Sequence, residues 1–387
     1  MDWKELFKQH IEKLDDRFDQ LTEGLKQRLG YPDPILILPY RTYGTMNRVY
    51  LKGRVLEDEK IRGAHDKDTI LNNLVNMYKR FESDEIKGAT LKVKFGAETY
   101  SVVSDDEGYF VLEIYPSSPV IAESLWHGVD IELESAPRPF DGSVSARAEI
   151  MIPPADAEYG IISDIDDTIV RTSATDMLAM ARTVFLHNAK TRLPFAGVAE
   201  FYKALQLGRN GKRNNPFFYV SSSPWNMYDL LKDFLDINGI PAGPLLLRDS
   251  GLTNNSIFSA GGGHMGHKFK EIEKILLAYP HLNFVLVGDS GQEDPKIYRE
   301  VALKFPGRVL AIYIRDVQVP EREKIAIEIS NELRGRQLDM IIVDNTVEAA
   351  EHAARAGLIF QAAIPDIEHD KQEDKGEISG KEELSVT

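Results

Sequence analysis

Closely spaced acidic residues follow a short apolar run near the middle of the sequence. In Tyr159-Gly-Ile-Ile-Ser-Asp-Ile-Asp-Asp-Thr-Ile-Val170, Asp164 and Asp166 stand where a buried strand would end. Carboxylates gathered in this way repel one another unless a cation or a shared proton compensates their charge. A hard divalent cation such as Mg2+ prefers carboxylate oxygens as ligands. These residues leave a catalytic and a structural role open, and an N-cap at Asp167 or Thr168 is compatible with either.

A serine pair and a lysine are the next residues that could do chemistry. Ser221 and Ser222 follow the apolar run Phe217–Val220. Lys268 follows a glycine-rich stretch and leads into the helical pattern Phe269–Tyr279. A lysine in a first helical turn opposes the helix dipole, but its charge would strengthen that helix end as an anion site. The structural alternatives are a turn for the serines and a solvated side chain for the lysine.

Two more aspartates follow a third apolar run. The segment Phe284-Val-Leu-Val-Gly-Asp-Ser-Gly-Gln-Glu-Asp-Pro295 contains Asp289 and Asp294. Asp289 alone could be an N-cap after a glycine turn. Each residue of the set has such an alternative, but their order along the chain favours one shared site.

Strand and helix patterns alternate from Tyr159 onward, and these elements must position the residues above. The alternation predicts a doubly wound parallel sheet. In such folds ligands lie beyond the carboxyl ends of the strands, where the polar residues stand. The expected strands are Gly160–Ser163, Phe217–Val220, Leu245–Leu247, Phe284–Val287, Val309–Ile314 and Met340–Val343.

Four motifs in this order resemble the haloacid dehalogenase (HAD) superfamily of phosphotransferases. More narrowly, they are similar to the catalytic-domain family of actin-patch phosphatidate phosphatases, which is related to the lipins. The resemblance extends over roughly residues 155–320. The motifs are Ser163-Asp-Ile-Asp-Asp-Thr168, Tyr219-Val-Ser-Ser-Ser-Pro-Trp-Asn226, Gly266-His-Lys268 and Val287-Gly-Asp-Ser-Gly-Gln292.

The resemblance implies a role for each catalytic position. Asp164 would be the nucleophile and would form an aspartyl-phosphate. Asp166 would protonate the leaving oxygen and then take a proton from the hydrolytic water. Ser221 and Lys268 would bind phosphoryl oxygens whose charge changes in the transition state.

The resemblance also implies a bound Mg2+. Its ligands would be the two aspartates of the first motif, Asp166 through its backbone carbonyl, together with Asp289 and Asp294. Further contacts to the substrate are predicted for Ser222, Arg192 and Arg248, with surface ion pairs as the alternative for the arginines.

Residues 32–153 show short alternating runs with turns between them, which predicts an antiparallel β-sandwich. Asp105-Asp-Glu-Gly108 is a hairpin-type turn signal between two of the runs. Asp68–Phe81 is expected to be an inserted helix. No catalytic constellation occurs here, so a positioning or recognition module is expected.

The two ends of the chain differ from the rest. Residues 1–31 carry one apolar stripe that predicts an amphipathic helix, with packing on protein favoured over docking to a membrane. Residues 366–387 are polar and acidic and are expected to be a disordered tail. The predicted domains are therefore the helix 1–31, the sandwich 32–153, a HAD-like domain 154–365 and the tail.

Composition limits the classes of partner. The 387 residues carry a formal net charge of -15, which argues against general nucleic-acid binding. The absence of cysteine excludes disulfides and thiol catalysis. The polar start and the lack of a long apolar run predict a cytoplasmic protein, with peripheral contact to membranes as a further option.

The predicted function is Mg2+-dependent hydrolysis of phosphatidate or a similar lipid phosphomonoester. Little chain is left for a large cap domain, and an open site suits a bulky or interface-bound substrate. The alternatives are a soluble phosphomonoesterase and a catalytically silent lipid-sensing module. Trp225 and Tyr228 could touch a lipid surface, but packing inside the protein is favoured. The sequence does not define the physiological substrate, the oligomeric state or the role of the sandwich domain.

Overall fold

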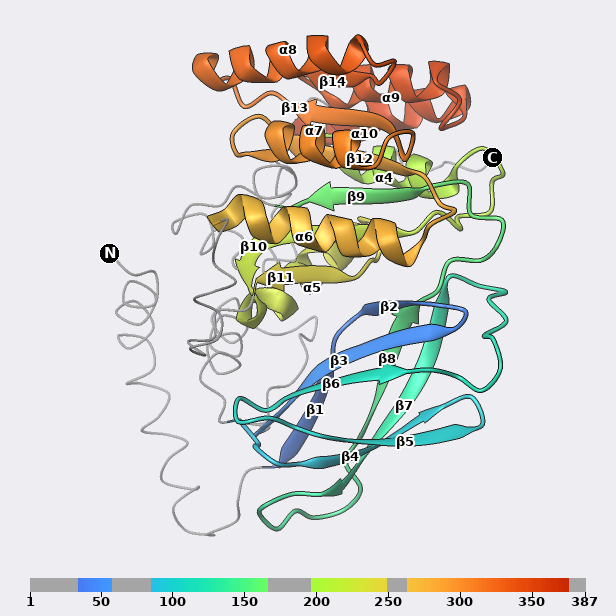
Figure 1. The fold of residues 1–387 in the computed structure, drawn as a ribbon, viewed down its shortest axis with the longest axis vertical. Coiled ribbons are helices and arrows are strands. Elements are labelled where there is room, and N and C mark those ends of the chain that lie inside the picture. The colour runs from blue at the N-terminus through green and yellow to red at the C-terminus, as the bar shows by residue number, and fades with distance from the viewer. Residues whose placement is uncertain (1–33, 58–84, 166–195, 249–262, 376–387) are drawn as a thin grey trace, which may run out of the picture.

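The computed structural model describes residues 34–57, 85–165, 196–248 and 263–375. Within these ranges the chain forms an eight-stranded, largely antiparallel sheet followed by a six-stranded parallel sheet with helices (Figure 1). The structure is thus of the mixed α/β class, as predicted. The predicted helices 1–31 and Asp68–Phe81, and residues 376–387 of the predicted tail, lie outside the described residues.

The antiparallel unit (residues 34–57 and 85–152) is built on alternating side chains. In β4, Leu91, Val93 and Phe95 point into the core and Lys92 and Lys94 point out, which is the period-2 pattern of a strand with one buried face. Strands from both halves of the sheet contribute to one apolar core, as in a sandwich. The strands are β1 Ile35–Pro39, β2 Thr42–Thr45, β3 Arg48–Glu57, β4 Thr90–Phe95, β5 Glu98–Val103, β6 Tyr109–Ile114, β7 Trp126–Ser135 and β8 Ser145–Met151.

The turn at Asp105–Gly108 forms as predicted, but it does not join a hairpin. The Asp105 carboxylate accepts hydrogen bonds from the backbone N–H groups of Glu107 and Tyr109, and Gly108 adopts a positive φ of 74°. The flanking strands pair elsewhere, β5 with β4 and β6 with β3. The turn therefore carries the chain from one half of the sheet to the other.

Strand β2 was not predicted. Its four residues include Gly44, and their short Thr-Tyr-Gly-Thr pattern has no run of apolar residues. A side chain at Gly44 would collide with the backbone of Arg48 and Val49, so this strand depends on close approach to β3. It also pairs in parallel with β8 and so joins the two halves of the sheet.

The parallel sheet has the strand order β11-β10-β9-β12-β13-β14. In chain order this is the doubly wound arrangement 3-2-1-4-5-6, whose strand order reverses between β9 and β12. The first strand is buried along its whole length, as expected of a parallel strand covered on both faces. The strands are β9 Gly160–Asp164, β10 Phe217–Pro224, β11 Leu245–Arg248, β12 Phe284–Asp289, β13 Val309–Arg315 and β14 Met340–Val343.

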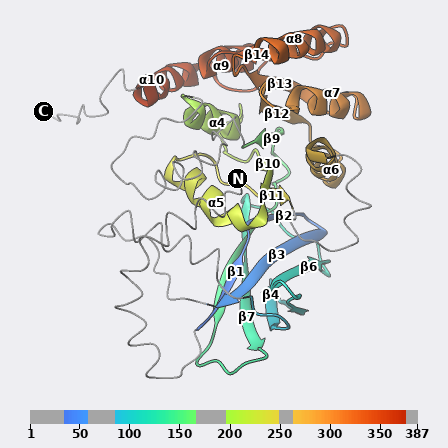
Figure 2. The ribbon, with the colours of Figure 1, turned by 90° about the vertical axis from the view of Figure 1, so that its left-hand side faces the viewer.

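Helices cover both faces of the parallel sheet (Figure 2). One apolar core lies under α4, α5, α9 and α10, and a second lies under α6, α7 and α8. Among the described residues, the helices are α4 Val198–Leu207, α5 Tyr228–Ile237, α6 Gly263–Ala278, α7 Asp294–Lys304, α8 Pro320–Arg334, α9 Thr346–Arg355 and α10 Ile364–Lys375, with 3-10 turns η1 Trp225–Met227 and η2 Gln361–Ala363.

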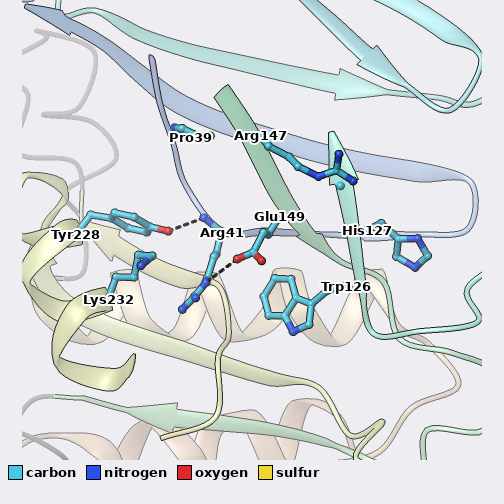
Figure 3. Close-up of a pocket in the computed structure, with 9 residues that line it drawn as sticks. Pro39, Arg41, Trp126, His127, Arg147, Glu149, Tyr228 and Lys232 are labelled. Atoms are coloured by element: carbon cyan, nitrogen blue, oxygen red, sulfur yellow. Dashed lines mark hydrogen bonds and ion pairs between the residues drawn. The ribbon is translucent and has the colours of Figure 1, made fainter. Parts of the chain in front are cut away.

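The two units share an extensive contact along α5. The Arg41 backbone N–H donates to the Tyr228 hydroxyl at 2.5 Å (Figure 3). The Arg41 guanidinium binds both carboxylate oxygens of Asp236 at 2.7 and 3.1 Å. Tyr40 is part of one core of the parallel sheet, and Tyr43 packs against the other. Burial of Tyr228 and the stacking of Trp225 on Tyr40 confirm that both aromatic residues after Ser221 pack inside the protein.

The acidic segment after Pro365 was expected to be disordered, and its first part is instead the ordered helix α10. Ile367 is fully buried against α4 and α9, which anchors the helix. Asp370 and Asp374 accept hydrogen bonds from the backbone N–H groups of Glu200 and Gly197, which lie at the start of α4. The acidic side chains therefore serve as N-terminal caps supplied by a distant helix, a role that composition does not reveal.

Docking of α10 should depend on pH. Burial raises the pKa of Asp374 from 3.8 to about 6, although the hydrogen bond from the Gly197 N–H acts to lower it. Burial also raises the pKa of Asp370. The Asp374 carboxyl of the folded state binds its proton more tightly than that of the unfolded chain. Protonation of Asp374 therefore stabilises the fold fully below about pH 4, and this contribution is lost as pH rises through 6. Asp374→Asn, which stays neutral and can still accept the hydrogen bond, should raise the thermal unfolding midpoint at about pH 7.5 and change it little at about pH 4. Glu368→Gln, on the exposed side of α10, is the control, and an equal shift for Asp374→Asn at both pH values would contradict the expectation.

Candidate active site

Polar residues meet where the strand order of the parallel sheet reverses. Asp164 ends β9 and Asp289 ends β12, and the two strands are hydrogen-bonded neighbours with Ser163 opposite Val287. On the other side of β9, Val220 lies opposite Asp164, so that Ser221 follows at the same edge of the sheet. Asp164, Ser221 and Asp289 are each no more than 1% exposed. This is the position at which a doubly wound sheet binds its ligand.

Lys268 reaches this edge from α6. Its Nζ lies 2.8 Å from Asp164 Oδ1 and 2.8 Å from Asp294 Oδ1, and donates to Gln292 Oε1 at 3.4 Å. The helix begins at Gly263, so Lys268 is in its second turn and not in the first turn that the sequence predicted. The helix dipole weakens beyond the first turn, and the two carboxylates supply the main compensation for the buried charge.

The loop after β12 places its two aspartates through the backbone. Asp289 Oδ1 accepts hydrogen bonds from the N–H groups of Gly291 and Gln292 at 2.6 and 3.0 Å. The Asp289 N–H donates to Asp294 Oδ2 at 3.3 Å. A Cβ atom at Gly288 would lie 2.5 Å from Asp294 Oδ2, so only glycine lets this carboxylate approach the strand end.

Asp164, Asp289, Asp294 and Lys268 form what we call the carboxylate–lysine cluster. One carboxylate oxygen from each aspartate lies within 4.8 Å of the others. Three buried carboxylates against one ammonium leave an excess of negative charge in a region of low dielectric. Oxygen ligands at this spacing, in a site with excess negative charge, fit a hard divalent cation.

The charge state of Lys268 follows from its surroundings. Burial lowers the pKa of Lys268, but the negative charges of Asp164 and Asp294 outweigh it, so the pKa stands above its usual value. The residue is therefore a permanent cation at the base of the cluster. An ammonium of this kind can hold phosphoryl oxygens, but it cannot act as a general base near neutral pH.

Two buried tyrosines support the strand ends. Ser163 Oγ donates to the Asp164 carbonyl at 2.7 Å, and the Tyr202 hydroxyl is hydrogen-bonded to Ser163 Oγ at 2.7 Å. The Tyr298 hydroxyl donates to the Val287 carbonyl at 2.8 Å. Burial raises the pKa of both phenols, so they remain protonated donors. Sequence reasoning missed both tyrosines, because each sits in a helix where it cannot be told from an ordinary core residue.

The predicted site residues have different outcomes. Asp164, Lys268, Asp289 and Asp294 converge. Ser221 lies on the adjacent strand, where its Oγ accepts a hydrogen bond from the Ser223 N–H. Ser222 is half-buried beside it, and Arg248 is exposed at the end of β11. Asp166 and Arg192 lie outside the described residues, so their roles stay predictions.

A cavity of about 400 Å³ lies away from this cluster, at the contact between the two units (Figure 3). Trp126, Arg147 and Glu149 from the antiparallel unit and Lys232 from α5 are among its lining residues. Two charged residues of the cavity wall form ion pairs within the protein: Glu149 with Arg41 at 3.2 Å and Lys232 with Asp236 at 2.9 Å. The cavity shares no residue with the carboxylate–lysine cluster.

Comparison with known proteins agrees with the geometry. Residues 159–316 match the family described as phosphatidate phosphatase APP1, catalytic domain. The phosphatidate phosphatase APP1 of Saccharomyces cerevisiae is 37% identical over 196 residues, which are 49% of this chain and 32% of the yeast protein. The uncharacterized protein C29B5.04c of Schizosaccharomyces pombe is 31% identical over 160 residues, which are 41% of this chain and 25% of that protein. These matches confirm the family resemblance that the four motifs predicted.

The similarity to solved structures is looser. A carbohydrate acetylesterase from Xanthomonas citri aligns with 77% of this chain and 73% of its own length, at 10% identity and a TM-score of 0.25. That score is too low to indicate a common fold. The matched region is about a third of the yeast protein and a quarter of the other curated relative.

Removal of the lysine charge should make the cluster unstable and more dependent on metal. Lys268→Met leaves three buried carboxylates without their cation, which should lower the free energy of unfolding by about 3–5 kcal/mol in chelator. Mg2+ should raise the thermal unfolding midpoint of the wild type, and should raise that of the variant further, because added negative charge binds a cation more tightly. Lys274→Met, on the exposed side of the same helix, is the matched control. Equal midpoints with and without Mg2+ in every protein would contradict a metal site in the cluster.

Proposed function

We propose that this protein is a metal-dependent phosphomonoester hydrolase of the HAD type whose substrate is phosphatidate. The proposal rests on the match of residues 159–316 to the APP1 catalytic-domain family and on the carboxylate–lysine cluster inside that segment. The single observation that carries it is the contact of Lys268 with both Asp164 and Asp294 at 2.8 Å, where the strand order reverses. A structural ion pair would need one carboxylate, whereas this lysine sits among three, as a site for a phosphate and a cation requires.

The proposed reaction has two steps. A carboxylate oxygen of Asp164 attacks phosphorus, and the bond between phosphorus and the alcohol oxygen breaks. The alcohol leaves with a proton, which the family resemblance assigns to Asp166. Water then attacks the aspartyl-phosphate and gives a proton to Asp166, the bond between phosphorus and Asp164 breaks, and phosphate is released.

The residues around the nucleophile have separate tasks in this scheme. Lys268 holds Asp164 in place before substrate binds and offers its ammonium to a phosphoryl oxygen afterwards. Ser221, at the neighbouring strand end, is suited to donate its hydroxyl proton to another phosphoryl oxygen. The tyrosines that bind the strand ends keep the backbone of Asp164 and of β12 in register. Asp164, Asp289 and Asp294 would hold Mg2+. Its positive charge would offset the repulsion between the carboxylates and a negatively charged phosphate.

The lipid assignment rests on the relative and not on a binding surface. The yeast protein matched by half of this chain is named as a phosphatidate phosphatase, and the matched region contains the cluster. In the described part of the chain, no helix combines the length and the apolar character needed to cross a bilayer. Residues 1–31, proposed above as an amphipathic helix, lie outside the described residues, so docking of this helix to a membrane remains a prediction.

Loss of the nucleophile should abolish turnover. Asp164→Asn retains the shape of the side chain but has no charge for attack on phosphorus, so kcat should fall below about a thousandth of the wild-type value. Release of inorganic phosphate from phosphatidate, followed with and without Mg2+, measures this. Asp156→Asn, an exposed aspartate paired with Lys212, is the control and should retain full activity. Turnover that survives Asp164→Asn would remove the proposed mechanism and would favour a different nucleophile.

The choice of substrate separates the proposal from its rivals. We expect kcat/KM for phosphatidate in mixed micelles to exceed that for sugar phosphates, nucleotides and phosphopeptides by about a hundredfold or more. Activity on the soluble esters alone would replace the lipid assignment with a soluble phosphomonoesterase. Binding of phosphatidate vesicles without turnover of any ester would favour the lipid-sensing module.

A further inference from the structure

A buried lysine of the antiparallel unit lies on an aromatic residue of the catalytic segment. Lys52, on β3, is 7% exposed, and its Nζ lies 3.8 Å from the centre of the Trp225 ring. The ring of Tyr109 lies 5.3 Å from the same ammonium. A cation that loses its water at the face of a tryptophan makes one of the stronger cation–π contacts.

The other contacts of Trp225 come from both units. Its ring stacks on Tyr40 with centroids 5.0 Å apart and an angle of 17° between the planes. Tyr228, at the start of α5, lies 6.2 Å away in a second stacked arrangement and receives a hydrogen bond from the Arg41 N–H. The antiparallel unit therefore contributes two residues, Lys52 and Tyr40, that contact the Trp225 ring.

Trp225 directly follows the irregular end of β10. Pairing of β10 with β9 ends at Val220, and the register between β10 and β11 is broken between Val220 and Pro224. β10 continues to Pro224, which pairs with Arg248 of β11 beyond the irregularity. Within this irregularity the Ser223 N–H donates to Ser221 Oγ at 2.9 Å. Ser221–Ser223 therefore lie between the strand pairs made by Val220 and Pro224, and Trp225 follows Pro224 directly.

We propose that Lys52, acting with Tyr40 through Trp225, is a positioning residue for the phosphate-binding segment Ser221–Ser223. The antiparallel unit is then part of the active-site architecture and not an independent module. This inference deepens the proposed function and rests on it, because it assumes that Ser221 binds the phosphoryl group. Lys52 itself need not touch the substrate. It contacts the Trp225 ring, and Trp225 follows the serine segment in the sequence.

The charge of Lys52 can be separated from its bulk. Lys52→Met keeps an unbranched side chain of similar length without the charge, and Lys52→Arg keeps a cation that can lie on the same ring. Lys304→Met is a matched control, because Lys304 also lies on an aromatic ring, that of Phe269 at 5.3 Å, but on the surface and outside the site. Trp225→Phe, alone and combined with Lys52→Met, measures the coupling of the two side chains.

Two measurements follow from the proposal. The first is the Kd of inorganic phosphate in the presence of Mg2+, by calorimetry on the full chain. The second is KM and kcat for the phosphomonoester that the wild type hydrolyses. We expect Lys52→Met to raise the Kd of phosphate and the KM about tenfold with kcat within about threefold of wild type. Lys52→Arg should restore most of the affinity, Lys304→Met should change nothing, and the double variant should be no worse than the single ones.

The alternatives give different results. A purely structural lysine would lower the fraction of folded enzyme, so kcat would fall and KM and the Kd of phosphate would not move. That result, or an additive double variant, overturns the inference even if the enzyme is an active phosphatase. Phosphate binding that weakens in Lys52→Met without turnover in the wild type would support the inference and remove the proposed reaction. A wild type that neither binds phosphate nor turns over an ester overturns both.

Discussion

The contact of one buried ammonium with two buried carboxylates is the constraint on which the rest of the site depends. Asp164 ends β9 and Asp294 begins α7, and Lys268 lies 2.8 Å from both of them. Three aspartates within 4.8 Å of one another could not remain charged and buried without such a cation. The lysine lowers the electrostatic cost of the cluster but does not cancel it. The remaining negative charge is the feature that fits a divalent cation in the proposed function.

The architecture meets this constraint with close packing around the strand ends. Gly288 leaves room for the Asp294 carboxylate, and the loop after β12 directs two backbone N–H groups at Asp289. Tyr202 and Tyr298 hold the adjacent strands through hydrogen bonds that lie entirely inside the protein. In the proposed reaction, carboxylates placed by this many fixed partners would need little rearrangement as charge develops on the substrate, as preorganised catalysis requires.

Sequence patterns predicted the parallel sheet better than they predicted its surroundings. All six parallel strands were found within one or two residues, apart from β10, which runs on to Pro224, because each is a buried apolar run between helical patterns. The α10 segment was misjudged, since its acidic composition resembles a disordered tail and its partners at the start of α4 are about 170 residues away. The turn at Asp105–Gly108 was found, but its local geometry does not decide which strands its flanks pair with. Strand β2 had no apolar run by which it could be recognised.

The order of Asp164, Ser221, Lys268 and Asp289 along the chain, each just after an apolar run or before a helix, was enough to predict the family resemblance and the residues that we propose for the chemistry. Side-chain type and spacing are local properties, so they can be read without knowing how the chain folds. Tertiary structure alone decided which aspartates share the lysine, which tyrosines support them, and that Lys52 of the antiparallel unit lies on the ring next to the serine segment. Lys268 meets Asp294, and Tyr298 meets Val287, only because the parallel-sheet unit brings its helices against its strand ends. Lys52 reaches the Trp225 ring only because the two units pack against each other.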